Sequence, residues 1–169
     1  GFRQLTNSVH PVHSVEDMKN LKLRVAGSNL LMKCYELWGA DATNMNWSET
    51  YTALQQKTVD GQEKPLPAID AASVQEVQKY VSLWNANYDC LFFCINQGIY
   101  DSLTQEQQKV VDEAGRKAVA YEREINRAGD EEILERWQSK NGVEVVKYED
   151  LDVESFKNAA EPVTEWFIN

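Results

Sequence analysis

The sequence is poor in the residues from which most catalytic and metal centres are built. It has only two histidines, His10 and His13, which flank Pro11 in a polar stretch. Nucleophilic catalysis needs a serine or cysteine within reach of a base that a third group holds, and neither histidine lies in such a pattern. No metal-ligand spacing and no glycine-rich phosphate loop occurs. These absences argue against an enzyme, a metal site and a bound cofactor.

Cysteine is also scarce, and the three cysteines form no even disulfide framework. Cys90 and Cys94 are four residues apart in an apolar run that is typical of a strand. Four strand steps would place them roughly 13 Å apart, beyond the reach of a disulfide. Cys34 falls on the apolar face of an expected helix. We therefore expect three small, buried, apolar side chains.

The sequence also has few basic residues and no long apolar run. The 17 basic residues face 27 acidic ones, for a formal net charge of −10, and no basic block occurs. This composition argues against nucleic acid as a partner. An acidic chain can still bind an acid, but only through local cations that overcome its general field. No signal peptide is present, and the longest apolar stretch, residues 90–95, is too short to span a bilayer.

The first half of the chain has the pattern of an α/β fold. Strands are expected over residues 2–6, 21–25 and 40–44, with a helix over residues 29–38 before the third. A second helix is expected to begin with Ser48 as its N-cap. A short β step then leads to a polar loop over residues 61–64, before Pro65 ends any ladder. This alternation predicts a mostly parallel sheet with crossover helices.

One long helical pattern dominates the second half. From Leu103 to about Ser139 the apolar residues keep helical spacing, which corresponds to on the order of 50 Å of helix. Such a helix exceeds one small domain, so it either bridges two lobes or projects into a partner. The other expected elements are a short helix over 65–72, a strand-rich segment over 74–83, a buried strand over 91–96, a strand over 143–146 and a terminal helix over 153–167, broken near Pro162.

Four blocks of sequence resemble, in order, the DctP-type solute-binding proteins of the tripartite ATP-independent periplasmic (TRAP) transporters. They are EDMKNLKLRV at 16–25, WSETYTALQ with VDGQEKP between 47 and 65, EVQKY at 76–80 and LTQEQ at 103–107. The similarity runs from Gly1 to about Glu165. It implies an α/β, periplasmic-binding-protein-like lobe with a mostly parallel sheet, flanking helices and one very long helix.

The resemblance also implies how the chain is divided. Gly1 falls on the family's Gly-Phe-Arg block, near the middle of a full-length binding protein, so the signal peptide and first half are expected to be absent. We expect residues 1–88 to form the core of the second lobe. Residues 89–140 would provide a strand and the long helix shared with the missing first lobe, and residues 141–169 would return to the second. Without that lobe, exposed apolar residues are expected to favour a homo-oligomer; these include Phe92, Phe93, Ile125 and Trp137.

Arg24 is the first candidate for binding a ligand. It lies at the carboxyl end of an expected strand, before a turn at residues 26–28 and a helix N-terminus, where ligands bind in open α/β sheets. Its planar guanidinium matches a carboxylate. A surface arginine paired with a nearby acid is the alternative that the residues alone leave open. The resemblance implies that Arg24 makes the bidentate contact to the ligand carboxylate.

Four more candidates rest on the resemblance. Arg3 stands where the family places a second ligand-facing arginine, and Trp47 where an aromatic side chain packs on the ligand, although Trp47 could instead pack on its own helix. Lys64 replaces the usual asparagine of the family, and Asn85 stands where many relatives have histidine. Lys64 could recognise a second carboxylate, extend into solvent or pair with Glu63.

Three further motif residues, Tyr51, Gln62 and Glu63, are expected mainly to support loop geometry. By resemblance, the protein is then a periplasmic solute-binding subunit that captures a small organic acid by its carboxylate and delivers it to a TRAP membrane permease. The alternative is a non-catalytic, oligomerising interaction module without a small ligand, in which the long helix is a dimerisation arm.

Overall fold

A computed structural model describes residues 1–168, apart from the side chain of Arg127. The strands are β1 (Phe2–Asn7), β2 (Lys22–Val25), β3 (Asp41–Asn44), β4 (Gly61–Pro65), β5 (Tyr80–Tyr88) and β6 (Glu144–Val146). The helices are α1 (Asn29–Leu37), α2 (Trp47–Gln55), α3 (Leu66–Ala71), α4 (Gln97–Asp101), α5 (Gln105–Arg136), α6 (Val153–Ala160) and α7 (Pro162–Ile168). Short 3-10 turns lie at Val15–Met18, Val74–Val77 and Tyr148–Asp150, and a π-helical turn at Trp137–Asn141 continues α5.

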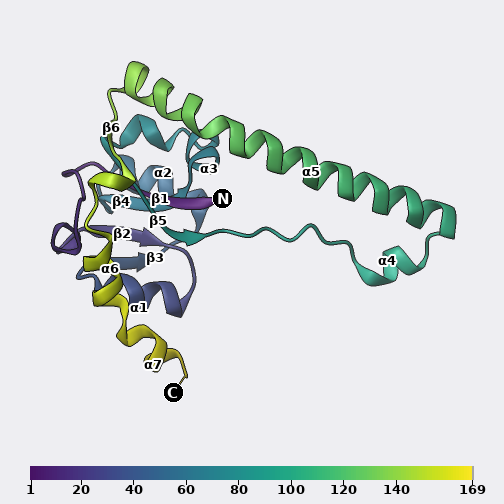
Figure 1. Ribbon diagram of the computed structural model, residues 1–169, viewed down its shortest axis with the longest axis horizontal. Coiled ribbons are helices and arrows are strands. Elements are labelled where there is room, and N and C mark those ends of the chain that lie inside the picture. The colour runs from purple at the N-terminus through teal and green to yellow at the C-terminus, as the bar shows by residue number, and fades with distance from the viewer. Residues whose placement is uncertain (169) are drawn as a thin grey trace.

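The six strands form one sheet in the order β3-β2-β4-β1-β5-β6. The ladders β2–β3, β2–β4 and β5–β6 are parallel, whereas β1 runs antiparallel to both of its neighbours, β4 and β5. The mostly parallel α/β fold expected from the sequence is therefore confirmed. Helices α1, α6 and α7 lie on one side of the sheet, and α2, α3 and the end of α5 lie on the other (Figure 1).

The largest difference from the expected elements is β4. The segment predicted as a polar loop is a strand near the middle of the sheet, and Gln62 and Glu63 in it are fully buried. The strand tolerates polar residues because they have partners on β1: the Gln62 amide donates to Thr6 Oγ1 at 2.9 Å, and Glu63 pairs with Arg3. Pro65 is the last residue of β4 and therefore ends the strand without preventing it.

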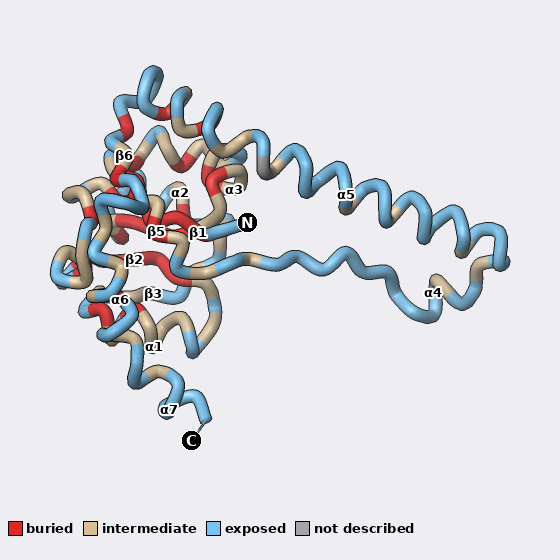
Figure 2. Tube along the Cα trace, in the orientation of Figure 1, coloured by how far each residue is buried: buried red, intermediate tan, exposed pale blue. Residues whose placement is uncertain are grey.

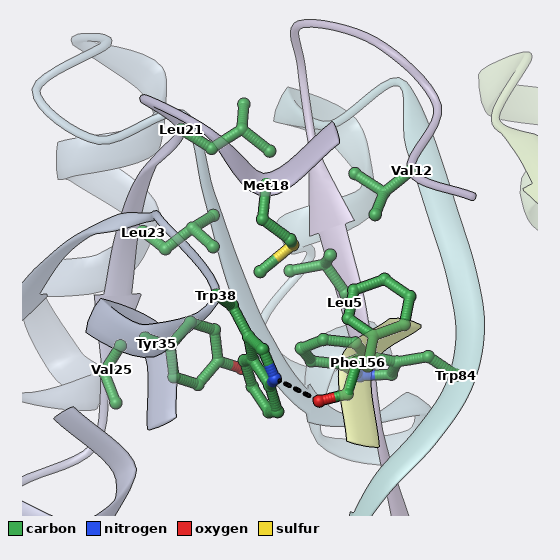
Figure 3. Packing of buried hydrophobic residues seen from close by; sticks show 10 residues of the cluster. All are labelled: Leu5, Val12, Met18, Leu21, Leu23, Val25, Tyr35, Trp38, Trp84 and Phe156. Atoms are coloured by element: carbon green, nitrogen blue, oxygen red, sulfur yellow. Dashed lines mark hydrogen bonds between the residues drawn. The ribbon is translucent and has the colours of Figure 1, made fainter. Parts of the chain in front are cut away.

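An aromatic cluster joins helix α6 to α1 and the sheet. Tyr35, Trp38, Trp84 and Phe156 pack edge-on or tilted, with ring centroids 5.1 to 6.2 Å apart. The Trp38 indole N–H also donates to the Phe156 carbonyl at 2.9 Å (Figure 3). This contact fastens α6 to α1 across 118 residues of sequence.

Beyond β5 the chain leaves the body of the fold. Residues 89–96 run without a strand partner, α4 turns the chain, and α5 brings it back (Figures 1 and 2). We call residues 89–125 the arm. The strand predicted over residues 91–96 is wrong, because the described segment beside it is helix α5, which offers no ladder to pair with. Cys90 and Cys94 are exposed, not buried as expected, and Cys34 is only half-buried.

The arm exposes much of its apolar surface. Leu91, Phe92 and Phe93 are 77% to 90% exposed, and Ile125 is exposed as expected. The prediction was wrong for Trp137, which is fully buried against the sheet and donates its indole N–H to Asp70 on α3 at 2.9 Å. Among residues 1–168, no helix is both long enough and apolar enough to cross a lipid bilayer.

Candidate functional site

Charged side chains gather at one end of the sheet, where the carboxyl ends of β2, β4 and β5 lie. Because β1 runs antiparallel, its second residue, Arg3, reaches the same end and lies opposite Pro65 and Asn87. Arg24 is the third residue of β2 and lies opposite Gln62 of β4. Helix α2 begins just after β3 at this end. The topology thus brings together residues that are up to 86 positions apart in the sequence.

Arg24 is a buried cation with an unused donor. Its Nε donates to the Met45 carbonyl at 2.9 Å, which fixes the plane of the guanidinium. The residue is only 4% exposed, and its Nη1 has no hydrogen-bond partner within the described part of the chain. Burial lowers the pKa of Arg24, and nearby Arg3 lowers it further, while Glu63 opposes the shift. A buried guanidinium with a spare donor is matched by a carboxylate, which accepts two parallel hydrogen bonds.

Trp47 provides an aromatic surface beside this cation. It is the first residue of α2, since Asn46, not Ser48 as expected, is the N-cap. The Asn46 carbonyl accepts from the Glu49 amide at 3.2 Å, so the helix begins earlier than predicted. Two cations lie over the indole ring: Arg24 Cζ is 5.4 Å and Lys64 Nζ 5.6 Å from its centroid. Such contacts attract the cations to the ring and limit their movement.

Arg3 belongs to the same cluster, but its donors already have partners. Its Nε and Nη2 both donate to the Glu63 carboxylate, the second at 2.7 Å, and its Nη1 donates to Asp89 at 2.6 Å. Burial opposes the charge on Arg3, but the bonds to Glu63 prevail and its pKa lies above the ordinary value. Burial raises the pKa of Glu63, although the hydrogen bond and charge of Arg3 counteract this. A direct contact between Arg3 and a ligand stays a prediction.

Lys64 lies beside Asp89, with 3.9 Å between Nζ and Oδ2. Its expected alternative partner, Glu63, points to the opposite face, as neighbouring residues of a strand do. Burial lowers the pKa of Lys64, and Arg3 adds to the shift, while Asp89 opposes it. The ammonium group is therefore held in the cluster next to Trp47.

Asn85 is not brought to this cluster by the structure. It lies in an irregular part of β5, between the two registers that pair with β1, and has a left-handed backbone with φ of 51°. Its side-chain oxygen accepts from Gln4 Nε2 at 2.7 Å, and the residue lines a separate hollow of about 370 Å³ beside Leu134 and Tyr148. A larger hollow, of about 490 Å³, lies within the arm. Neither hollow is lined by Arg24.

Two members of the cluster were missed or misjudged from the sequence. Asp89 lies in no motif, and only the fold shows that it contacts both Arg3 and Lys64. Glu63 is part of the recognised VDGQEKP block, but its role is a buried ion pair with Arg3, not support of a loop. Within residues 1–168, no group of three or more histidine, cysteine or carboxylate side chains could hold a metal ion. The arrangement is suited to holding an anion.

Comparison with known proteins agrees with this geometry. The whole chain, residues 1–169, matches the family model DctP, described as bacterial extracellular solute-binding protein, family 7. A relative from Escherichia coli (strain K12), the 2,3-diketo-L-gulonate-binding periplasmic protein YiaO, is 33% identical over 159 residues, which cover 94% of this chain and 48% of that protein. The chain spans about half the length of the curated relatives that it matches.

Solved structures give the same result. The sugar acid binding protein DctPAm from Advenella mimigardefordensis, in complex with galactonate, superposes with a TM-score of 0.90 at 32% identity, covering 99% of this chain and 54% of that one. A TRAP periplasmic solute-binding protein from Polaromonas sp. JS666, bound to D-erythronate, superposes with a TM-score of 0.88 at 32% identity, with the same coverage.

Proposed function

This chain belongs to the DctP family of bacterial extracellular solute-binding proteins, family 7, and from that premise we propose that its charged cluster holds the carboxylate of a small organic acid. The observation that supports the proposal most is Arg24. It is a buried guanidinium that forms no salt bridge with a described residue and keeps one donor free. A free buried donor costs stability unless a ligand satisfies it.

In the proposed complex Arg24 orients the carboxylate, while Trp47 and Lys64 border the bound acid. The relatives named above include proteins whose ligands are sugar acids, so hydroxylated carboxylates are the first candidates. Arg3 would then act chiefly by positioning Glu63 and Asp89. Asn85 would contact the ligand only if β5 were rearranged around it.

We further propose that the intact protein works in the periplasm and delivers its acid to a TRAP membrane permease. Residues 1–88 and 141–169 would form one lobe. Residues 89–140 would be shared between the two lobes, because the end of α5 packs on this lobe through Ile133 and Trp137, while the arm would extend into the other lobe, which a part of the protein outside this chain would supply. The exposed apolar side chains of the arm agree with such a partner. The relatives give no support to a ligand-free oligomerising module, and homo-oligomerisation of the separate chain stays a prediction.

Thermal stability in the presence of candidate ligands tests the binding function. In the intact protein, at least one sugar acid, such as D-erythronate or galactonate, is expected to raise Tm in a concentration-dependent way. The control is the matching polyol, erythritol or galactitol, in which the carboxylate is replaced by CH2OH. The polyol is expected to leave Tm unchanged. Equal stabilisation by acid and polyol would contradict a role for the carboxylate.

The affinity is expected to fall at alkaline pH because of Lys64. In the free site its pKa lies below the ordinary lysine value, and a carboxylate bound nearby would raise it again. The affinity is therefore highest when the pH is below the pKa that Lys64 has in the free site. It weakens as the pH rises through that value, by at most about tenfold per pH unit, since a single proton is linked.

Calorimetric titrations of the intact protein between about pH 7 and pH 10 measure this slope. The Lys64→Met variant should bind more weakly at neutral pH and show a flatter profile. An identical slope in the variant would mean that another group titrates.

A further inference from the structure

The charges of the cluster do not balance. The cluster contains three cations, Arg3, Arg24 and Lys64, and two carboxylates, Glu63 and Asp89. Two of the cations have a partner: Arg3 is paired with Glu63 and Asp89, and Lys64 with Asp89. Only Arg24 has no carboxylate of its own among the described residues. The cluster therefore lacks a single negative charge.

We propose that Asp89 sets the charge of the acid that this site accepts, so that the site binds a monocarboxylate and discriminates against a dicarboxylate. The inference rests on the proposed binding function and refines its substrate class. Asp89 already lies beside Lys64, the cation that would otherwise attract the second carboxylate of a longer acid. Lys64 is thus paired with Asp89 and is not a receptor for a second charge.

The position of Asp89 makes this role possible. It directly follows β5, and its backbone N–H donates to the Gly1 carbonyl at 2.8 Å, so the residue is held against β1. Its side chain is 27% exposed and that of Lys64 is 24% exposed, so water screens the pair only in part. Arg3 Nη1 holds the other side of the carboxylate at 2.6 Å. The carboxylate is therefore fixed between two cations.

The energetic argument follows from burial. Arg24 is 4% exposed and Glu63 is fully buried, so charges here interact more strongly than they would in water. One ligand carboxylate beside Arg24 brings the five residues and the ligand to neutrality. A second carboxylate would add a surplus negative charge close to Asp89 and Glu63, and part of its hydration would be lost.

Changing Asp89 to asparagine tests the proposal with little change of shape. The amide oxygen can still accept from Arg3, while the negative charge beside Lys64 is removed. The site then lacks two negative charges, which suits a dicarboxylate. Asp41→Asn is the matched control, because Asp41 is an exposed aspartate at the start of β3, the opposite end of the sheet.

The measurement is calorimetric titration of the intact protein with pairs of acids that differ only at the far end. D-Erythronate is compared with meso-tartrate, and galactonate with galactarate. Any other acid that the protein binds is compared with the dicarboxylate that has a second carboxylate at its far end. The wild type is expected to bind the monocarboxylate at least about tenfold more tightly, and Asp89→Asn should shift this ratio toward the dicarboxylate by about tenfold or more. Asp41→Asn should leave the ratio unchanged.

Two results would overturn the inference: a wild type that prefers the dicarboxylate, or a ratio that Asp89→Asn does not move. Both would leave the binding function intact. If the wild type bound no member of any pair and no other acid, the proposed function itself would fail, and this refinement with it. Lys64→Met separates the two roles further, because it should lower the gain in dicarboxylate binding of the Asp89→Asn variant.

Discussion

Replacing Arg24 by methionine is expected to abolish acid binding without weakening the fold. Removing one member of a buried charge pair typically costs roughly 2–5 kcal/mol of binding, or on the order of 30- to 4,000-fold in Kd. The folded protein, however, contains Arg24 as a buried cation with an unused donor. Its removal relieves a desolvation cost, so Tm without ligand should stay the same or rise.

Calorimetry and thermal unfolding of the intact protein check both halves of this expectation. Arg24→Lys keeps the charge but loses the two-pronged geometry, so it should recover only part of the affinity. Lys22→Met is the control, since Lys22 is an exposed cation at the other end of β2. Full binding by Arg24→Met would remove the main support for the proposed function. A large fall in its Tm would show that Arg24 is structural.

The second large effect is expected at Gly61, the first residue of β4. A Cβ atom there would collide with the Thr6 carbonyl and would approach Asn7 Cβ to 2.8 Å and Leu23 Cδ2 to 2.9 Å. The first of these is backbone of the neighbouring strand and cannot yield without breaking the β1–β4 ladder. Gly61→Ala is therefore expected to cost about 4 kcal/mol or more, or to prevent folding.

The matched control is Gly129→Ala in the carboxyl-terminal third of α5. Apart from the adjacent residues and the backbone of the helix itself, no described atom lies within 4 Å of the added methyl group, and a glycine in a helix costs about 0.5–1 kcal/mol relative to alanine. This variant should therefore be slightly more stable. Urea unfolding of the separate chain measures both changes. A Gly61→Ala protein of nearly normal stability would show that β4 can move away from β1.

The parallel part of the fold could be predicted from the sequence, because each of its strands and helices has a pattern of its own in neighbouring residues. Strand and helix patterns alternate from Lys22 onward, and the position of Arg24 at the end of a strand already indicated a binding edge. The resemblance added Trp47 and Lys64, and the structure places Trp47 next to Arg24 and Lys64 next to Trp47.

What the sequence could not show depends on distant partners. The residues of β4, GQEKP, have no strand-like alternation, and they become a central strand only because Arg3 and Thr6 on β1 satisfy Glu63 and Gln62. Asp89 reaches its partners through the β1–β5 pairing, across 86 positions. The opposite error occurred in the arm, where an apolar run suggested a buried strand. An apolar run indicates that a segment needs a partner, not that the partner is present.

The arm is attached to the body of the fold through α5, so a rotation at the end of α5 would move the whole arm. The carboxyl-terminal end of α5, beyond the arm, is held at Asp70, which accepts from the Trp137 indole at 2.9 Å and pairs with Arg136 at 2.6 Å. The 32 residues of α5 measure about 48 Å, so each degree of tilt at Asp70 would move the far end by about 0.8 Å. Small rotations at this pivot would thus be magnified into displacements that a pair of distance probes can resolve.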